Sequence, residues 1–123
     1  MDYLRIWADE SGESHLEEVT IARTVVPAEP GTVELHVSAP LTVDRLQFLE
    51  AIAVDQVPDW HCAPRRQIVM WLDGWVRITA SDGDSRTLPA GAVVLAEDLH
   101  GAGHMTEHEP GVRRIVQIPL EPA

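Results

Sequence analysis

The chain has 123 residues, 45% of them hydrophobic and 24% charged, a composition that indicates one globular domain and excludes both a disordered chain and two independent cores. Its 20 acidic and 9 basic residues give a net charge of −11, which argues against binding a polyanion such as DNA. No apolar run is long enough to span a bilayer, and Cys62, the single cysteine, cannot form an intramolecular disulfide. We therefore expect a cytoplasmic, reducing location, no membrane contact and no nucleic-acid partner.

Proline and glycine punctuate the chain, and runs rich in β-branched residues lie between them. The segment 9–24 is polar and acidic as far as residue 19, and we expect one turn of helix around residues 14–18. The runs that predict strands are 32–37, 41–52, 67–72, 75–80, 92–96, 104–107 and 112–119. Short strands separated by turns in this way are typical of an all-β sandwich or barrel.

The strongest local signal is the Asp73-Gly74 pair between the runs 67–72 and 75–80. Because glycine accepts a positive φ at little cost, this pair predicts a hairpin that joins the two runs. A second Asp-Gly pair at 82–83 predicts a further turn. Alternation along the first strand places Gln67, Val69 and Trp71 on one face.

Six histidines are present, and three of them lie at even spacing near the C-terminal end: His100, His104 and His108. On a strand they would all face the same side, and neutral imidazole is the commonest metal ligand in proteins. We interpret His15 and His36 as surface residues without chemistry. His108 lies between Glu107 and Glu109, and we expect it to be solvated in a loop.

Five segments in a fixed order resemble a small single-domain cupin: WHCAPRRQ (60–67), LDGWV (72–76), SDGD (81–84), LPAGAVVLAED (88–98) and GAGH (101–104). The resemblance covers about half of the chain, from residue 58 to residue 119. It implies an all-β cupin fold, a double-stranded β-helix or jelly-roll barrel, as a single domain over 1–123. N-terminal strands would occupy about 1–57 and the motif-bearing barrel core about 58–119. It also implies a homodimer, with the N-terminal strands, 32–37 in particular, as candidates to pair with a second subunit.

Aligned with the general cupin motifs, His61 and His104 stand at histidine positions and Gln67 at the glutamate position. The resemblance thus implies a divalent metal ion (zinc, nickel or iron) held by His61, Gln67 and His104. The chain departs from the motifs at Ala63, which cannot ligate, and at Glu97, which replaces a proline. Fewer anionic ligands hold a metal less tightly but leave open coordination positions, and a metal-free binding cavity is the alternative.

Further residues are candidates for substrate binding and proton transfer. Arg65 could form a forked pair with a substrate carboxylate or lie on the surface. Gln47 and Gln117 are polar residues within predicted strands, and Trp71 could line a pocket for an aromatic substrate or pack in the core. Glu97 and His100 are the candidate catalytic bases. Glu97 and its neighbour Asp98 could equally be turn residues.

Three functions are compatible with these residues. The first is a metal-assisted isomerase or epimerase that acts next to the carbonyl of a small, possibly aromatic, organic acid in secondary metabolism. The second is a non-haem iron dioxygenase, which usually requires three nitrogen ligands or two histidines and a carboxylate. The third is a non-enzymatic module that binds a small molecule. We favour the first, because proton transfer tolerates a weaker ligand set.

Overall fold

The structure is a computed structural model that describes residues 1–121. Over this range it is all-β, without any helix, so no helix here is long and apolar enough to cross a membrane. The strands are β1 (Tyr3–Ala8), β2 (Ser14–Val19), β3 (Thr24–Val26), β4 (Leu35–Val37), β5 (Gln47–Ala53), β6 (Gln67–Trp71), β7 (Val76–Ala80), β8 (Ser85–Leu88), β9 (Val93–Ala96), β10 (His104–His108) and β11 (Gly111–Pro119).

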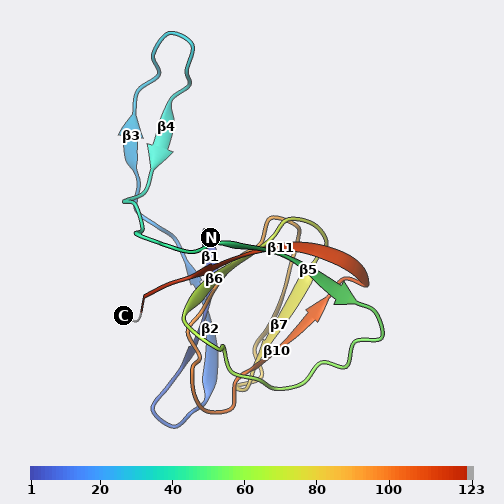
Figure 1. The fold of residues 1–123 in the computed structure, drawn as a ribbon. Helices are drawn as coiled ribbons and strands as arrows, with labels where there is room; N and C mark the ends of the chain where they lie inside the picture. The colour runs from blue at the N-terminus through green and yellow to red at the C-terminus, as the bar shows by residue number, and fades with distance from the viewer. Residues whose placement is uncertain (122–123) are drawn as a thin grey trace.

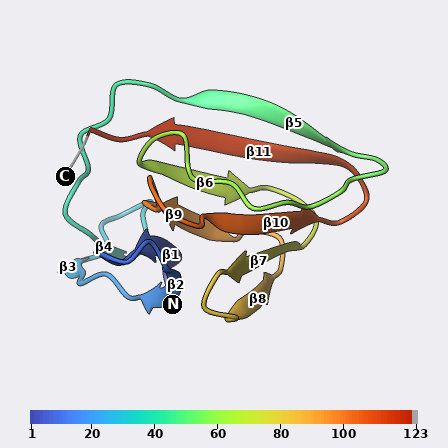
Figure 2. The same cartoon turned by 90° about the horizontal axis from the view of Figure 1, so that it is seen from below.

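The strands form a large sheet of six strands in the order β2-β1-β9-β6-β11-β5 and a small sheet of three in the order β10-β7-β8. β1 and β9 are parallel, and the other pairs in both sheets are antiparallel. Figures 1 and 2 show that the two sheets enclose a common interior, with β5 at the outer edge of the large sheet beyond β11. This arrangement is consistent with the expected β-sandwich class.

The core lies between the two sheets and is built from the inward positions of their strands. Leu4, Ile6 and Val94 come from the large sheet and Val76 and Ile78 from the small sheet, and none of them is more than 1% exposed. Burying an aliphatic side chain of this size contributes about 1.5–3 kcal/mol to the stability of the fold. Because both sheets supply these contacts, neither could bury its apolar face alone.

Residues 14–18 are not helical, so that expectation is wrong. They belong to β2, which pairs with β1 over six residues from Ala8↔Ser14 to Tyr3↔Val19. Ser14 at the start of β2 is fully buried, whereas Glu17 and Glu18 further along are exposed, so this strand covers the edge of the core with its first residues. The hydrogen bonds to β1 outweigh the helix propensity of these residues, because propensity has little influence over so short a segment.

The hairpin expected at Asp73-Gly74 is also wrong, although the turn is present. β6 pairs with β9 and β11, whereas β7 pairs with β8 and β10, so Asp73-Gly74 carries the chain from the large sheet to the small one. The turn at 82–83 does join two paired strands, β7 and β8. The predicted runs 32–37 and 41–52 contain β4 and β5, but strands β1, β3 and β8 were not among the runs.

A long exposed segment separates β2 from the core strands. β3 and β4 form a two-stranded hairpin, and within the described residues these strands pair only with each other. Figure 1 shows this hairpin standing away from the two sheets. Every residue from 22 to 50 is exposed, so this part of the chain adds nothing to the core.

Candidate functional site

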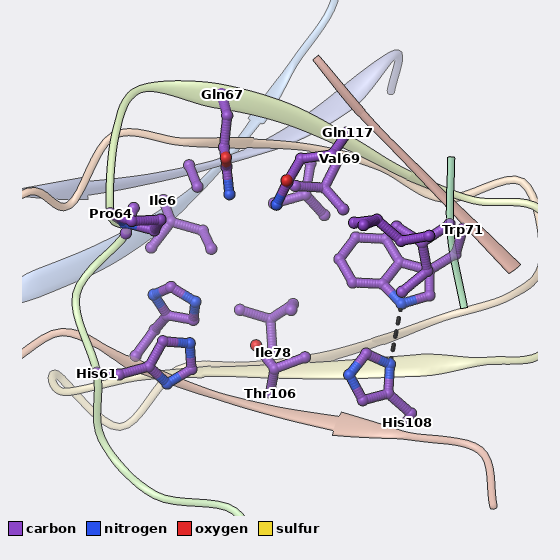
Figure 3. Close-up of a pocket in the computed structure, with 16 residues that line it drawn as sticks. Ile6, His61, Pro64, Gln67, Val69, Trp71, Ile78, Thr106, His108 and Gln117 are labelled. Atoms are coloured by element: carbon purple, nitrogen blue, oxygen red, sulfur yellow. Dashed lines mark hydrogen bonds between the residues drawn. The ribbon is translucent and has the colours of Figure 1, made fainter. Parts of the chain in front are cut away.

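A cavity of about 180 Å³ lies between the two sheets. It is smaller than the ~300–1,000 Å³ of pockets that hold drug-sized ligands, so it has room only for a small molecule or for one end of a larger one. Figure 3 shows Gln67, Val69, Trp71 and Gln117 along one wall and His61, Thr106 and His108 opposite. The alternation predicted for β6 is confirmed, because Gln67, Val69 and Trp71 all line the cavity.

His104 begins β10 and lines the cavity, although only 6% of its surface is exposed. Its Nδ1 lies 2.6 Å from Oδ2 of Asp98, a carboxylate with 0% exposure. The carboxylate accepts the Nδ1–H, which leaves a lone pair on Nε2 for a proton, a metal ion or a ligand. Asp98 therefore fixes both the tautomer and the orientation of the His104 ring.

His61 lies next to His104, with 4.6 Å between the ring centroids. The two residues form an isolated β-bridge, in which each backbone N–H donates to the other's carbonyl at 2.9–3.0 Å. His61 Nδ1 lies 3.1 Å from the carbonyl oxygen of Asp59 and donates to it, so Nε2 keeps its lone pair. His61 is exposed, and it connects the buried His104 ring to solvent.

Two glutamine side chains line the cavity from the large sheet. Gln67 on β6 is 6% exposed, and its Oε1 is buried without a hydrogen-bond partner in the protein. Gln117 on β11 is the diagonal neighbour of Gln67 on the adjacent strand β6. In the register of these two strands, Gln117 is opposite Val69 and Gln67 is opposite Pro119. Buried amide oxygens without a partner are rare, so Gln67 Oε1 indicates a position for a ligand donor or a metal ion.

His108 is a cavity residue, and the expectation that it is solvated in a loop is wrong. It ends β10, lines the cavity and accepts a hydrogen bond of 3.1 Å on Nδ1 from Nε1–H of Trp71. Burial lowers the pKa of His108 below 6.5, so the ring is neutral at pH 7 and carries its proton on Nε2. The even spacing from His104 was the sequence signal that could have placed it here.

The segment that follows β5 borders the cavity from outside. Gln56 makes two hydrogen bonds to the backbone of His108, donating at 2.7 Å and accepting at 3.0 Å. A shallower hollow lined by residues 56–61, Thr106 and His108 lies on this side, and Trp60 at its rim is 44% exposed. Gln56 therefore holds this rim segment against β10.

Several residues expected in the site do not line this cavity. His100 is exposed in the loop before β10, and Arg65 and Gln47 lie at a separate surface depression with Asp44. Glu97 accepts hydrogen bonds from Arg5 and Arg66, both at 2.6 Å. Although burial opposes it, these two guanidinium groups lower the pKa of Glu97, which suits an ion-pair partner and not a base.

Glu97 and Asp98 illustrate how alternation separates neighbours. They follow β9 directly, and consecutive residues in extended chain point to opposite sides. Glu97 faces the arginines on the outside, while Asp98 faces His104 in the interior. Of this acidic pair, the residue that contacts the cavity histidine is Asp98.

Comparison with models of protein families and with curated proteins finds no match.

The divalent metal ion implied by the cupin resemblance can be tested against these residues. His61 and His104 each present an Nε2 lone pair and Gln67 an unpartnered oxygen, so the three side chains supply donor atoms of the kinds that a divalent ion takes. Within residues 1–121, no three His, Cys, Asp or Glu side chains gather where they could hold a metal ion. The set thus lacks the carboxylate of common catalytic sites, and the one nearby, Asp98, is bonded to His104 Nδ1.

Proposed function

We propose that the chain is a cupin-fold isomerase that moves a proton next to the carbonyl of a small organic acid, with His104 as the base. The observation that carries the proposal is the buried Asp98–His104 pair, whose free Nε2 belongs to a residue that lines the cavity. A carboxylate at Nδ1 stabilises the imidazolium that forms when Nε2 accepts a proton. The cupin assignment is supported by the motif order and by the convergence of His61 and His104 from segments 43 positions apart.

The other polar side chains of the cavity supply the remaining roles. His108 is neutral, and its Nε2–H is a donor for the oxygen that becomes negative when the adjacent carbon loses its proton. The amide N–H groups of Gln67 and Gln117 are further donors, and among the described residues no arginine lines the cavity. His61, exposed beside His104, exchanges the abstracted proton with solvent.

The cavity also suggests the substrate class. Val69, Trp71, Ile78 and Ile115 make its wall apolar, and its volume is about 180 Å³. An organic acid with a small apolar or aromatic group beside its carbonyl matches both the size and the lining. Because both histidines lie together, the proton leaves and returns on one face, which favours isomerisation over inversion of a stereocentre.

A hydrogen–deuterium exchange assay tests this proposal with phenylpyruvate as the probe. The unmodified protein should accelerate exchange of the proton next to the carbonyl with D₂O, followed by ¹H NMR. His104→Gln keeps an N–H near Asp98 but removes the base, and the acceleration should fall by about 10²–10⁴-fold, the usual contribution of a positioned acid–base group. Asp98→Asn should produce a loss of similar size, because the tautomer is no longer fixed.

His100→Gln is the matched control, since His100 is exposed and does not line the cavity. It should keep full exchange activity. Loss of exchange in His100→Gln, or full exchange in His104→Gln, would overturn the assignment of the base. Binding of the probe without any exchange would favour the non-enzymatic binding module.

Divalent metal binding is a second candidate function, supported by the unpartnered Gln67 Oε1 and by two imidazoles with free Nε2 atoms that line the same cavity. A bound ion would stabilise negative charge on a ligand oxygen, but the same His104 lone pair cannot serve both as ligand and as base. The dioxygenase expectation gains no support, because within residues 1–121 neither a third histidine nor a carboxylate gathers with His61 and His104 where it could join them on a metal ion.

Metal analysis separates the two candidates. After equilibration with Zn²⁺ or Ni²⁺ and removal of free ions, the unmodified protein, His61→Ala and His104→Ala are compared, with circular dichroism to check folding. Stoichiometric metal in the unmodified protein alone would establish the metal site and exclude His104 as the base. Equal metal content in all three would exclude His61 and His104 as ligands.

A further inference from the structure

The hollow on the outer side of the cavity, here called the outer hollow, shares part of its lining with the cavity. Its volume is about 430 Å³, against about 180 Å³ for the cavity. His61, Thr106 and His108 line both spaces, and because His61 is exposed, the cavity opens into the outer hollow beside its ring. The two together reach the ~300–1,000 Å³ of sites for drug-sized ligands, which the cavity alone does not.

The opening lies where the edges of the two sheets are left unpaired. β5 ends the order of the large sheet and β10 that of the small sheet, and among residues 1–121 these two strands do not pair with each other. The chain from Gln56 to His61, here called the rim segment, belongs to the connection from β5 to β6, and Figure 2 shows this connection passing β10. Residues 57–60 of the rim segment line the outer hollow.

Both ends of the rim segment are fixed to β10. At one end, the side chain of Gln56 makes hydrogen bonds of 2.7 and 3.0 Å with the backbone of His108. At the other end, the backbones of His61 and His104 exchange hydrogen bonds of 3.0 and 2.9 Å. The residues between these two anchors therefore form a wall with a defined position, and a ligand that binds to a pre-formed wall has a smaller entropic cost.

Trp60 gives this wall a surface for a planar group. The residue is 44% exposed although it lines the outer hollow, and Val57 on the same wall is 87% exposed. The backbone N–H of Trp60 donates to Oδ1 of Asp59 at 2.8 Å, which restrains the chain at this point. An aromatic group that stacks on the exposed indole removes apolar surface of both rings from water.

The charges around the two spaces oppose the binding of an anion. Lysine is absent from the chain, and among residues 1–121 no arginine lines the cavity or the outer hollow. Two carboxylates are present instead, Asp98 bonded to His104 and Asp59 in the outer hollow. A carboxylate removed from water without a cationic partner is strongly unfavourable. The amide donors of Gln67 and Gln117 therefore favour an uncharged ester or amide over a free carboxylate.

From these observations we propose that the substrate is a molecule of two parts. An acyl group with its carbonyl lies in the cavity, and an ester or amide joins it to a planar apolar group that stacks on Trp60 in the outer hollow. This assignment rests on the function proposed above, which brings the carbon next to the carbonyl to His104. The reaction that supplies such a substrate is one that couples an organic acid to an alcohol or an amine, since this coupling removes the charge of the carboxylate.

Three probes separate the contributions of the linkage and of the second part. They are phenylpyruvate, its N-methyl amide and its N-benzyl amide, and their dissociation constants are measured by titration calorimetry. The N-methyl amide should bind at least ~10-fold more tightly than phenylpyruvate, because it carries the same acyl group without the charge. The N-benzyl amide should bind about 10-fold more tightly again, because its ring stacks on Trp60.

Trp60→Ala tests the position of the second part. It should reduce the advantage of the N-benzyl amide over the N-methyl amide to less than about 3-fold, because the stacking surface is removed. Phe48→Ala is the matched control, since Phe48 is an aromatic residue with 82% exposure that lines neither the cavity nor the outer hollow. It should keep the full advantage. Both residues are exposed, and circular dichroism checks that both variants fold.

Each part of the proposal has a result that would overturn it. Phenylpyruvate that binds as tightly as the N-methyl amide, or more tightly, would exclude the uncharged linkage. Equal affinity for the two amides, or an advantage of the N-benzyl amide that survives Trp60→Ala, would exclude the second part from the outer hollow. Absence of binding by all three probes would also overturn the proposal.

The exchange assay described above reports on the isomerase separately from these affinities. Binding in the expected order together with hydrogen–deuterium exchange would support both proposals. Binding in the expected order without exchange would support the two-part site and exclude the isomerase. Exchange of phenylpyruvate without the expected order of affinities would support the isomerase and exclude the two-part substrate.

Discussion

His104 owes its chemistry to the carboxylate behind it. Asp98 is fully buried, and its one side-chain partner in the described structure is His104, since Oδ1 of the same carboxylate has no partner. Removing one member of such a buried pair leaves an uncompensated charge, which costs about 3–5 kcal/mol. Variants of His104 therefore have to retain a donor towards Asp98, which is why His104→Gln is preferable to His104→Ala in activity measurements.

At the same scale, the contact between Trp71 and His108 predicts a fixed tautomer. Because Trp71 donates to Nδ1 and burial lowers the pKa of His108, the ring should be neutral with its proton on Nε2. ¹⁵N NMR of labelled protein should show a protonated Nε2 and an unprotonated Nδ1 at pH 7, with a titration midpoint below 6.5. Trp71→Phe removes the donor and should give a mixture of tautomers, and an unchanged spectrum would contradict the assigned hydrogen bond.

Among the elements, the loop between β9 and β10 decides where the histidines meet. Gly103 has a φ of 75°, and a Cβ atom there would lie 2.4 Å from the carbonyl carbon and oxygen of His61. Only glycine lets the two backbones approach closely enough to form the bridge between His61 and His104. The loop thus positions a cavity histidine and makes room for its neighbour.

Gly103→Ala should therefore be more damaging than an alanine at another glycine of similar conformation. Gly83 is the matched control, since its φ is 96° and its Cβ would meet nothing within 4 Å. Gly83→Ala should cost about 1–2 kcal/mol, the strain of a left-handed conformation. Gly103→Ala should cost about 1–3 kcal/mol more from overpacking, measured by urea unfolding. Equal losses would show that the close approach to His61 does not contribute.

Across the whole molecule, a polar cluster joins the β1–β2 turn to the β7–β8 turn. His15 lies between Asp9 and Asp82, with distances of 2.7 Å from Nε2 and 2.9 Å from Nδ1 to their carboxylate oxygens. The hydrogen bond to Asp9, followed by that to Asp82, raises the pKa of His15 above 6.5. The same contact with His15 lowers the pKa of Asp9 to about 2.

These shifts predict a pH window for the stability of the fold. The contribution of His15 to the stability of the fold is complete below pH 6.5, the pKa of a histidine in the unfolded chain. It is lost as the pH rises through the higher pKa that His15 has in the folded protein. The contribution of Asp9 to the stability of the fold is complete above pH 3.8, the pKa of an aspartate in the unfolded chain. It is lost as the pH falls towards about 2, the pKa of Asp9 in the folded protein. The difference in melting temperature between the unmodified protein and His15→Gln should be largest between these limits and shrink on both sides.

His36→Gln is the control for this measurement, because within residues 1–121 the one side-chain hydrogen bond of His36 is with the exposed Glu34, at 2.9 Å. Its melting temperature should follow that of the unmodified protein at every pH. A constant difference for His15→Gln from pH 4 to pH 9 would show that the cluster does not titrate as described.

Part of the fold and part of the cavity lining could be predicted from the sequence. Turn residues and β-branched runs predicted an all-β domain, and alternation correctly placed Gln67, Val69 and Trp71 on one face. His100 and Glu97 were chosen as bases from their position near the glycine loop, but neither lines the cavity. His108 was marked by its even spacing from His104, whereas nothing in the sequence distinguished Asp98 from its acidic neighbour Glu97 as the partner of His104.

By itself, the sequence determined the class of fold, the turns, and the inward face of β6, since these depend on backbone preferences and side-chain alternation over a few residues. Only the tertiary structure decided that β6 and β7 belong to different sheets, that Asp98 and not Glu97 contacts His104, and that within residues 1–121 β3 and β4 pair with neither sheet. These outcomes depend on which distant segments bury one another's surface. Which segments pack together is determined by the free energy of the whole chain, so it cannot be predicted from any short stretch of residues.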